Sequence, residues 1–276
     1  MKKTLYISDL DGTLLNSRAE LSDFSARTLR ELTANGLSFG VATARSPATA
    51  AGKMSGIPLS VPTILLNGVC LYDLNTGKYA NIEYISREIC SELIGIIHRH
   101  SLAGFLFTVE DGQQHTYYES TDSPNAISFI EERRRKYGKK FMKTDDFADC
   151  AAKGTVYYSI SDTKEKLLAA HEEICALDGV HAEFYSDVYN EGYWYMEICS
   201  STASKYRAAM LLRERYGFER LVGFGDNYND LPLFDACDEC YAPINANEEI
   251  KRRADGVIDS NDGDGVAKKL IELAAK

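Results

Sequence analysis

Leu5-Tyr6-Ile7-Ser8 has the composition of a short buried strand, and Asp9-Leu10-Asp11-Gly12-Thr13 follows it directly. If the strand belongs to a parallel sheet, Asp9 and Asp11 lie at its carboxyl end, where open α/β sheets bind ligands. Their spacing directs both side chains the same way wherever the chain stays extended. Two such close carboxylates are costly without a cation or a shared proton, and Mg²⁺ prefers oxygen ligands of this kind. A plain polar turn is the alternative, but a D-x-D-G-T run that leaves an apolar strand is unusual for one.

Short apolar runs alternate with stretches of helical spacing at both ends of the chain. The strands expected there are residues 4–8, 37–43, 64–66, 221–225, 240–242 and 257–258. The helices expected between and after them are residues 22–34, one from Ser46-Pro47, one from Asn229, residues 247–254 and a last helix near the C-terminus. Strands that alternate with helices imply right-handed crossovers and a mostly parallel sheet. We therefore predict an α/β core with a doubly wound, mostly parallel, Rossmann-like sheet.

The middle of the chain has a different pattern. Two β-rich runs in residues 103–119 flank Glu110-Asp111-Gly112-Gln113, which is a good hairpin signal. Further elements are expected in the order helix 123–137, strand 155–160, helix 162–177, and strands 180–185 and 193–198. This is an α+β pattern, so we predict an inserted α+β cap domain at residues 83–190. Residues 1–82 and 191–276 would then form one discontinuous core domain.

The first acidic segment resembles the opening motif, D-x-D-G-[TV], of the haloacid dehalogenase superfamily of phosphohydrolases and phosphotransferases. Three later segments are similar to its other motifs in the right order: Val41-Ala42-Thr43-Ala44-Arg45, Ser204-Lys205, and Gly225-Asp226-Asn227-Tyr228-Asn229-Asp230. Asn67-Gly68 also matches a dipeptide common in the Cof-type branch, in which a cap lies between the second and third motifs. One departure is Tyr206, which follows the motif lysine where a glycine is common.

This resemblance implies a role for each motif residue. Asp9 would attack phosphorus and form an aspartyl-phosphate, Asp11 would exchange protons with the leaving oxygen and with water, and Lys205 would supply positive charge. The residues expected at the Mg²⁺ site are Asp9, Asp11 (through its backbone carbonyl), Asp226 and Asp230, the last as a ligand or as a partner that orients one. The residues expected to bind the phosphate or the substrate are Leu10, Gly12, Thr43, Arg45, Asn67, Lys205 and Asn229.

The composition limits what the chain binds. Its 276 residues include 31 Lys and Arg against 41 Asp and Glu, a net charge of −10, which argues against nucleic-acid binding. Seven thinly spread cysteines indicate free thiols in a reducing compartment. No apolar run approaches the ~18 residues of a membrane span and the N-terminus has no leader pattern, so we expect a cytoplasmic protein with no membrane partner. We expect a monomer or a small homo-oligomer.

The leading hypothesis is a Mg²⁺-dependent phosphatase that acts on a small phosphorylated substrate, with sugar phosphates considered first and nucleotides or cofactor phosphates next. A phosphomutase or phosphotransferase would use the same nucleophile with another acceptor. A non-catalytic receiver module, phosphorylated on its aspartate as a signal, is a third possibility from a different class. Receivers are single doubly wound domains, in which the insertion and Asp11 would have no task.

Overall fold

The computed structural model describes residues 2–121, 124–187 and 192–275, and these form two compact units. One unit comprises Met1–Asn81 and Ala203–Lys276, and the other comprises Ile82–Thr202. The second unit is thus inserted in the sequence of the first. Its start lies one residue before the expected 83, but its end is Thr202 and not 190. The inserted unit ends later than expected because the strand Tyr193–Ser200 pairs with strands of the second unit and not with the core sheet.

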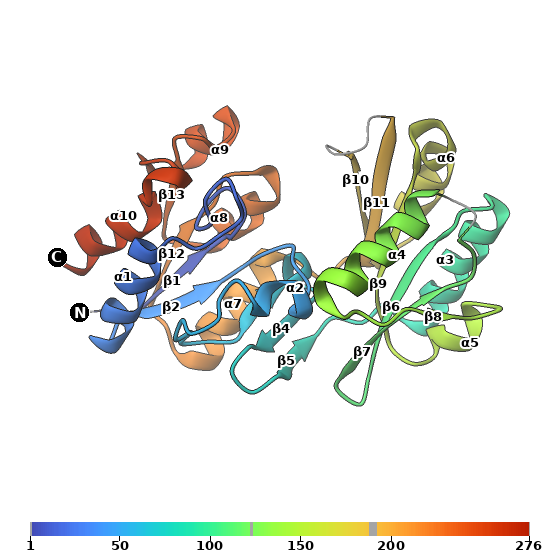
Figure 1. The fold of residues 1–276 in the computed structure, drawn as a ribbon, viewed down its shortest axis with the longest axis horizontal. Helices are drawn as coiled ribbons and strands as arrows, with labels where there is room; N and C mark the ends of the chain where they lie inside the picture. Colours follow the sequence, from blue (N-terminus) through green and yellow to red (C-terminus); the bar gives the residue numbers. More distant parts are fainter. Residues whose placement is uncertain (1, 122–123, 188–191, 276) are drawn as a thin grey trace. The chain divides into compact units, whose positions relative to one another are not determined.

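The first unit is built on a five-stranded sheet of order β14-β13-β12-β1-β2 in which every neighbouring pair is parallel. Its strands are β1 (Thr4–Ser8), β2 (Ser38–Val41), β12 (Arg220–Phe224), β13 (Glu239–Pro243) and β14 (Gly256–Ile258). β1 pairs with β2 on one edge and with β12 on the other, in a register that places Ser8 opposite Phe224. The α/β fold with a parallel, Rossmann-like core sheet is confirmed (Figure 1).

Helices cover both faces of this sheet. They are α1 (Asp23–Ala34), α2 (Pro47–Ala51), α7 (Lys205–Tyr216), α8 (Leu231–Ala236), α9 (Glu248–Arg253) and α10 (Gly265–Ala274). α1 and α10 share an apolar cluster with Tyr6 of β1, whereas α7 and α8 share another with Leu5 and Ile7. β1 is therefore buried on both sides, as an interior parallel strand should be. The expected start of the first helix is confirmed, since the Ser22 hydroxyl accepts a hydrogen bond from the Ser25 backbone N–H.

A small second sheet in this unit differs from expectation. It contains β3 (Thr63–Leu65), β4 (Cys70–Asp73) and β5 (Lys78–Ile82), and a short 3-10 turn, Leu66–Gly68, joins the first two. β3 was expected within the core sheet, but it pairs antiparallel with β4 and touches the core sheet through a single parallel bridge between Ala42 and Ile64. The β4–β5 hairpin was not expected from the sequence.

The second unit is a six-stranded sheet of order β10-β11-β9-β6-β7-β8. Its strands are β6 (Gly104–Glu110), β7 (Gln113–Tyr118), β8 (Met142–Lys143), β9 (Thr155–Thr163), β10 (Val180–Ser186) and β11 (Tyr193–Ser200). Its helices are α3 (Arg87–Arg99), α4 (Pro124–Tyr137), α5 (Ala148–Ala151) and α6 (Lys164–Cys175). The expected hairpin is confirmed, with both Asp111 and Gly112 in the left-handed region. The expected start of α4, Ser123, lies outside the described residues.

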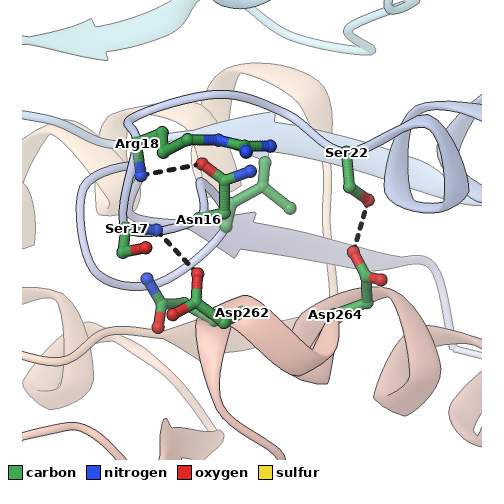
Figure 2. Close-up of a pocket in the computed structure, with 8 residues that line it drawn as sticks. Asn16, Ser17, Arg18, Ser22, Asp262 and Asp264 are labelled. Atoms are coloured by element: carbon green, nitrogen blue, oxygen red, sulfur yellow. Dashed lines mark hydrogen bonds between the residues drawn. The ribbon is translucent and has the colours of Figure 1, made fainter.

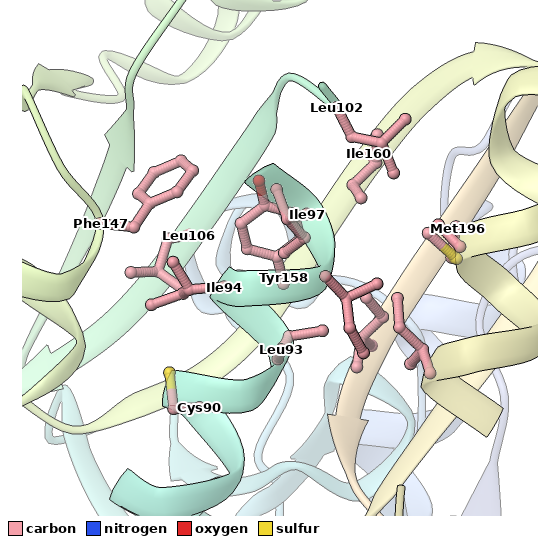
Figure 3. Packing of buried hydrophobic residues seen from close by; sticks show 14 of the residues in the cluster. Cys90, Leu93, Ile94, Ile97, Leu102, Leu106, Phe147, Tyr158, Ile160 and Met196 are labelled. Carbon is pink, nitrogen blue, oxygen red and sulfur yellow. The ribbon is translucent and has the colours of Figure 1, made fainter. Parts of the chain in front are cut away.

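One face of this second sheet carries the apolar core of the unit. Figure 3 shows Leu93, Ile94 and Ile97 of α3 against Leu106 and Tyr158 of the strands. α6 contributes Leu167, Ala170 and Ile174 to the same cluster. Since side chains alternate along a strand, the neighbouring residues of β6, β9 and β11 project from the opposite face. None of the described helices is long and apolar enough to cross a membrane.

Candidate active site

The loop after β1 begins at Asp9, which is 5% exposed and whose backbone N–H donates to the Phe224 carbonyl at 2.9 Å. Leu10 then turns the chain back, because its carbonyl oxygen accepts the N–H groups of Leu14 and Leu15 at 3.1 and 2.8 Å. The Leu10 side chain is fully buried in the core of the first unit. Leu10 therefore contributes a turn and an apolar anchor, and only its backbone remains a candidate for phosphate contact.

Gly12 allows this loop to approach the end of β12 closely. Its φ is +80°, and a Cβ at this position would lie 2.4 Å from Asp226 Oδ2. Thr13, which is buried, donates its hydroxyl to Asp226 Oδ1 at 2.7 Å. Glycine is required here both for the backbone conformation and for the space that the aspartate occupies.

Lys205 is the central cation of the site. Its side chain is fully buried, and its Nζ donates to Asp9 Oδ1 at 2.8 Å and to Asp230 Oδ1 at 2.6 Å. Burial alone would lower the pKa of Lys205, but the facing carboxylates of Asp230 and Asp9 raise it above its ordinary value. Lys205 is therefore a permanent ammonium, which places one positive charge between two buried carboxylates.

Asp230 organises the turn after β12. It is fully buried, and its Oδ2 accepts the backbone N–H groups of Asp226 and Asn227 at 2.9 and 3.1 Å. A Cβ at Gly225 would lie 2.5 Å from the Asp230 Cβ, so a glycine before the turn is needed for this packing. Both oxygens of Asp230 thus have partners within the protein. This geometry favours the expected role of a partner that orients Lys205 and Asp226.

Three carboxylates converge around this lysine. Asp9, Asp226 and Asp230 each present one oxygen, and the three atoms lie within 4.8 Å of one another. Burial raises the pKa of Asp226 to about 6, and burial also raises that of Asp9 well above its usual range although Lys205 opposes the shift. Three carboxylates against one ammonium leave an excess of negative charge in a desolvated space. An all-oxygen donor set of this kind fits a hard divalent cation.

The Asp11 side chain does not join this group. Its two oxygens accept from Arg45 Nε at 2.7 Å and from Arg45 Nη2 at 2.5 Å, and the side chain of Asp11 is 50% exposed. The chain is extended only as far as Ser8, where β1 ends, so the condition under which Asp9 and Asp11 would point the same way is not met at Asp11.

The second motif and the Asn67-Gly68 dipeptide are linked to the fourth motif by hydrogen bonds. Thr43 is buried, its hydroxyl accepts the Arg45 backbone N–H at 3.2 Å, and its carbonyl accepts the Asn67 N–H at 3.1 Å. Asn229 Nδ2 donates to Asn67 Oδ1 at 3.2 Å. The expected phosphate-binding residues from three separate segments are thus placed in one connected network.

Gly68 brings this network to the start of α7. Its φ is +106°, and a Cβ there would lie 2.2 Å from the Ser204 carbonyl oxygen and 2.9 Å from the Lys205 backbone nitrogen. Ser204 is the N-cap of α7 and accepts from the Arg207 N–H at 3.1 Å. The dipeptide therefore helps to fix where Lys205 enters its helix. Tyr206, which stands where glycine is common, is 41% exposed, so part of its side chain reaches solvent.

Two asparagines that the sequence reasoning missed also support the site. Asn245 Nδ2 donates to the Gly12 carbonyl at 2.8 Å, and the Asn247 backbone N–H donates to the Asp226 carbonyl at 3.0 Å. Both follow β13 at the carboxyl edge of the parallel sheet. Their position after a strand was the available signal, because polar residues at this edge face the same site.

A polar pocket of about 270 Å³ adjoins the loop after β1, and Asp262 and Asp264 of the acidic C-terminal segment line one side of it (Figure 2). The Ser17 N–H donates to Asp262 Oδ1 at 2.8 Å, and the Ser22 hydroxyl donates to Asp264. Asn261 Nδ2 donates to the Leu15 carbonyl at 3.0 Å. These hydrogen bonds hold residues 15–22, which follow the active-site loop, against the C-terminal segment. The polar groups that make them are therefore already paired within the protein.

The described part of the chain contains one further group of close metal-ligating atoms, His98, Glu119 and Asp146 in the second unit. Glu119 lies 3.0 Å from His98 Nε2 and accepts the Phe147 N–H at 2.6 Å. Asp146 accepts the Ala148 N–H at 2.7 Å. These bonds connect α3 to the start of α5, which accounts for the group as a structural one.

A family model described as haloacid dehalogenase-like hydrolase matches residues 6–270. A pyridoxal phosphate phosphatase of Escherichia coli is 23% identical over 268 residues, which cover 94% of this chain and 94% of the relative. A 5-amino-6-(5-phospho-D-ribitylamino)uracil phosphatase of Bacillus subtilis is 22% identical over 290 residues, covering 98% and 97%.

Solved structures share the fold along the whole chain. A haloacid dehalogenase-like hydrolase from Bacteroides thetaiotaomicron has a TM-score of 0.78 at 23% identity, with 99% of this chain and 100% of that chain covered. A protein from Thermotoga maritima gives a TM-score of 0.78 at 24% identity, with 99% and 97% covered.

Proposed function

The chain belongs to the haloacid dehalogenase-like hydrolases, and we propose that it is a Mg²⁺-dependent phosphatase that hydrolyses a small phosphorylated metabolite through an aspartyl-phosphate. One observation carries this proposal. The buried Lys205 ammonium bonds both Asp9 and Asp230, while Asp226 presents an oxygen within 4.8 Å of those carboxylates. A phosphate monoester is a dianion, so its hydrolysis depends on positioned positive charge, and this cluster provides a place for it.

Asp9 is the proposed nucleophile. Lys205 holds Oδ1, so we assign the attack on phosphorus to Oδ2, which forms the aspartyl–phosphate bond as the ester P–O bond breaks. Burial raises the pKa of Asp9 overall, and the Lys205 ammonium opposes this shift and so favours the carboxylate that the attack requires. Asp9, Asp226 and the Asp11 backbone carbonyl would hold Mg²⁺, which supplies further positive charge to offset the carboxylates and the phosphate oxygens.

Asp11 is the proposed general acid and base. It would give a proton to the leaving oxygen in the first step and take one from water as the aspartyl-phosphate is hydrolysed in the second. Both of its oxygens are held by Arg45 here, so the reaction requires Asp11 to exchange this partner for the leaving oxygen. Asp11 is half-exposed but Arg45 is largely buried, so the exchange breaks a bidentate ion pair at the edge of the site.

The proposed substrate is a sugar phosphate or a phosphorylated cofactor. Thr43, Asn229 and Arg45 supply hydroxyl, amide and guanidinium groups for the phosphate from the connected network around Asn67. The names of the Escherichia coli and Bacillus subtilis relatives add pyridoxal phosphate and a phosphorylated ribitylaminouracil to the compounds that should be tested.

The test is a screen of these phosphate esters for release of free phosphate, with Mg²⁺ and with EDTA. Asp9→Asn should lower turnover by at least about a hundredfold, as expected when a covalent nucleophile is lost. Asp235→Asn is the matched control, because Asp235 lies on the surface in an exposed pair with Arg253. Full activity in Asp9→Asn, or full activity in EDTA, would reject the proposal. An isomerised product without free phosphate would identify a phosphomutase.

A further inference from the structure

A second pocket, of about 290 Å³, lies wholly within the second unit, on the sheet face opposite its apolar core. Its walls come from α4 and from residues at or beside β6, β9 and β11. The volume is at the small end of the range for pockets that bind small molecules, and it suits a single ring. The pocket lies outside the aspartate–lysine cluster, which belongs entirely to the first unit.

The strand register explains the floor of this pocket. Phe105 of β6 is paired with Ser159 of β9, and Tyr195 of β11 is paired with Ser161 of β9. Residues paired across antiparallel strands share a face, and Ser159 and Ser161 are two apart on one strand. Two small side chains therefore lie between two aromatic rings, and the hollow is the space that larger residues would fill.

α4 supplies the opposite wall. Its Phe129 ring stacks on Phe105 with centroids 4.8 Å apart and an angle of 25° between the planes. The Arg133 guanidinium lies 4.6 Å from the centroid of the Phe129 ring, which adds a second contact to that ring. These contacts hold flat apolar surfaces at the pocket. Such surfaces favour a planar ligand, because aromatic rings prefer offset-stacked or edge-to-face contacts.

The polar groups of the pocket include one that lacks a partner. The Ser161 hydroxyl is buried and makes no hydrogen bond to any described residue, and leaving such a group unpaired is unfavourable. A serine hydroxyl changes rotamer easily and can serve a ligand as donor or acceptor. Glu132 is the charged residue among those that line the pocket, and Lys136 pairs with it at 2.6 Å. The lining residues therefore offer hydrogen bonds and ring surfaces and no cation for a phosphate.

We propose that this pocket is a binding site for a single planar heteroaromatic ring that carries hydrogen-bonding substituents. The ring packs offset or edge-to-face against the stacked pair of Phe105 and Phe129, and its polar edge gives the Ser161 hydroxyl a partner that no described residue supplies. Every group involved belongs to the second unit. Binding is therefore independent of the proposed phosphatase reaction and is measurable in its absence.

The experiment is isothermal titration of the full chain in EDTA with three unphosphorylated probes: pyridoxine, uracil and myo-inositol. The first two are heteroaromatic rings and the third is a non-aromatic polyol of similar size. At least one ring should bind with a Kd of about 1 mM or tighter, whereas myo-inositol should not bind. Absence of binding by both rings up to about 10 mM, or equal binding of myo-inositol, would overturn the proposal.

Two variants locate the binding to this pocket. Phe129→Leu keeps an apolar side chain without the ring face and should weaken ring binding about tenfold. Ser161→Ala removes the unpaired hydroxyl and should weaken it about fivefold while leaving the melting temperature equal or higher. Thr108→Val is the control, because Thr108 has another buried hydroxyl without a described partner, on β6 and away from the pocket.

If Ser161→Ala and Thr108→Val bind the ring equally well, the hydroxyl is not a ligand contact and the assignment fails. Asp9→Asn should bind the ring as the wild type does. This separates failure of the pocket from failure of the proposed phosphatase, since Asp9 belongs to the first unit and does not line the pocket.

Discussion

Gly68→Ala tests whether the Asn67-Gly68 dipeptide positions the lysine of the active site. The added methyl would lie 2.2 Å from the Ser204 carbonyl oxygen, where a real Cβ contact needs more than 3 Å. The clash involves two stretches of backbone, so a side-chain rotation cannot relieve it. Either the turn at Gly68 or the start of α7 must shift, and Lys205 is the first residue of α7.

The expected cost has two parts. A left-handed backbone, here with φ of +106°, costs about 1–2 kcal/mol when alanine replaces glycine. Overpacking against rigid backbone adds about 1–3 kcal/mol, which gives a total of about 2–5 kcal/mol. Relief of the overlap moves Lys205 by about 1 Å, and such a misplacement at a catalytic group costs about a hundredfold in rate.

Gly36→Ala is the matched control for this variant. Gly36 has φ of +93°, but nothing lies within 4 Å of its added Cβ, so only the backbone cost of about 1–2 kcal/mol applies. Urea unfolding gives the two stabilities, and phosphate release from a synthetic aryl phosphate gives the two rates. If both variants lose the same stability and keep the same activity, Gly68 does not position Lys205 and the reasoning is refuted.

Three other perturbations have defined outcomes. Lys205→Met leaves two buried carboxylates without their ammonium and should lower the free energy of unfolding by about 3–5 kcal/mol in metal-free urea titrations; a loss under 1 kcal/mol would contradict the geometry. Asp11→Asn should change stability by only about 1 kcal/mol, because the Asp11 side chain is half-exposed although Arg45 is largely buried, yet slow phosphate release about 10²–10⁴-fold; unchanged turnover would remove Asp11 from the mechanism. Burial, and then the nearby charge of Arg133, lower the pKa of Lys139 from 10.5 to about 7. Between pH 7 and 10.5 the lysine is therefore protonated in the unfolded chain and neutral in the folded chain. The free energy of unfolding consequently rises with pH over this range. The melting temperature of Lys139→Met should therefore lack the rise that the wild type shows between pH 7 and 10. If the two proteins give the same dependence of melting temperature on pH, the Lys139 amine is not buried.

The sequence predicted the parts of the fold that depend on local pattern. β1 is apolar on both faces because helices cover both sides, so its run of Leu5, Tyr6 and Ile7 was readable without any partner. The starts of α1 at Ser22 and of α2 at Ser46-Pro47 could be predicted because N-capping is a contact over three residues.

The errors come from contacts between distant residues. Tyr193–Ser200 has the composition of a strand in either sheet, and only its pairing with β9 and β10 decides which. The β4–β5 hairpin was missed, although in its turn Asp73 accepts hydrogen bonds from the Asn75 and Thr76 N–H groups. The residues on either side of this turn include few strong β-formers, so the turn did not indicate a hairpin.

β1 lies between two strands that reach it at very different times during synthesis. β2 is complete at Val41, but β12 starts only at Arg220, so one edge of β1 waits unpaired while most of the polypeptide is still being made. The inserted unit, Ile82–Thr202, is contiguous and leaves the ribosome before β12 does. It can fold first, and Asp9 is enclosed only after β12 has been made.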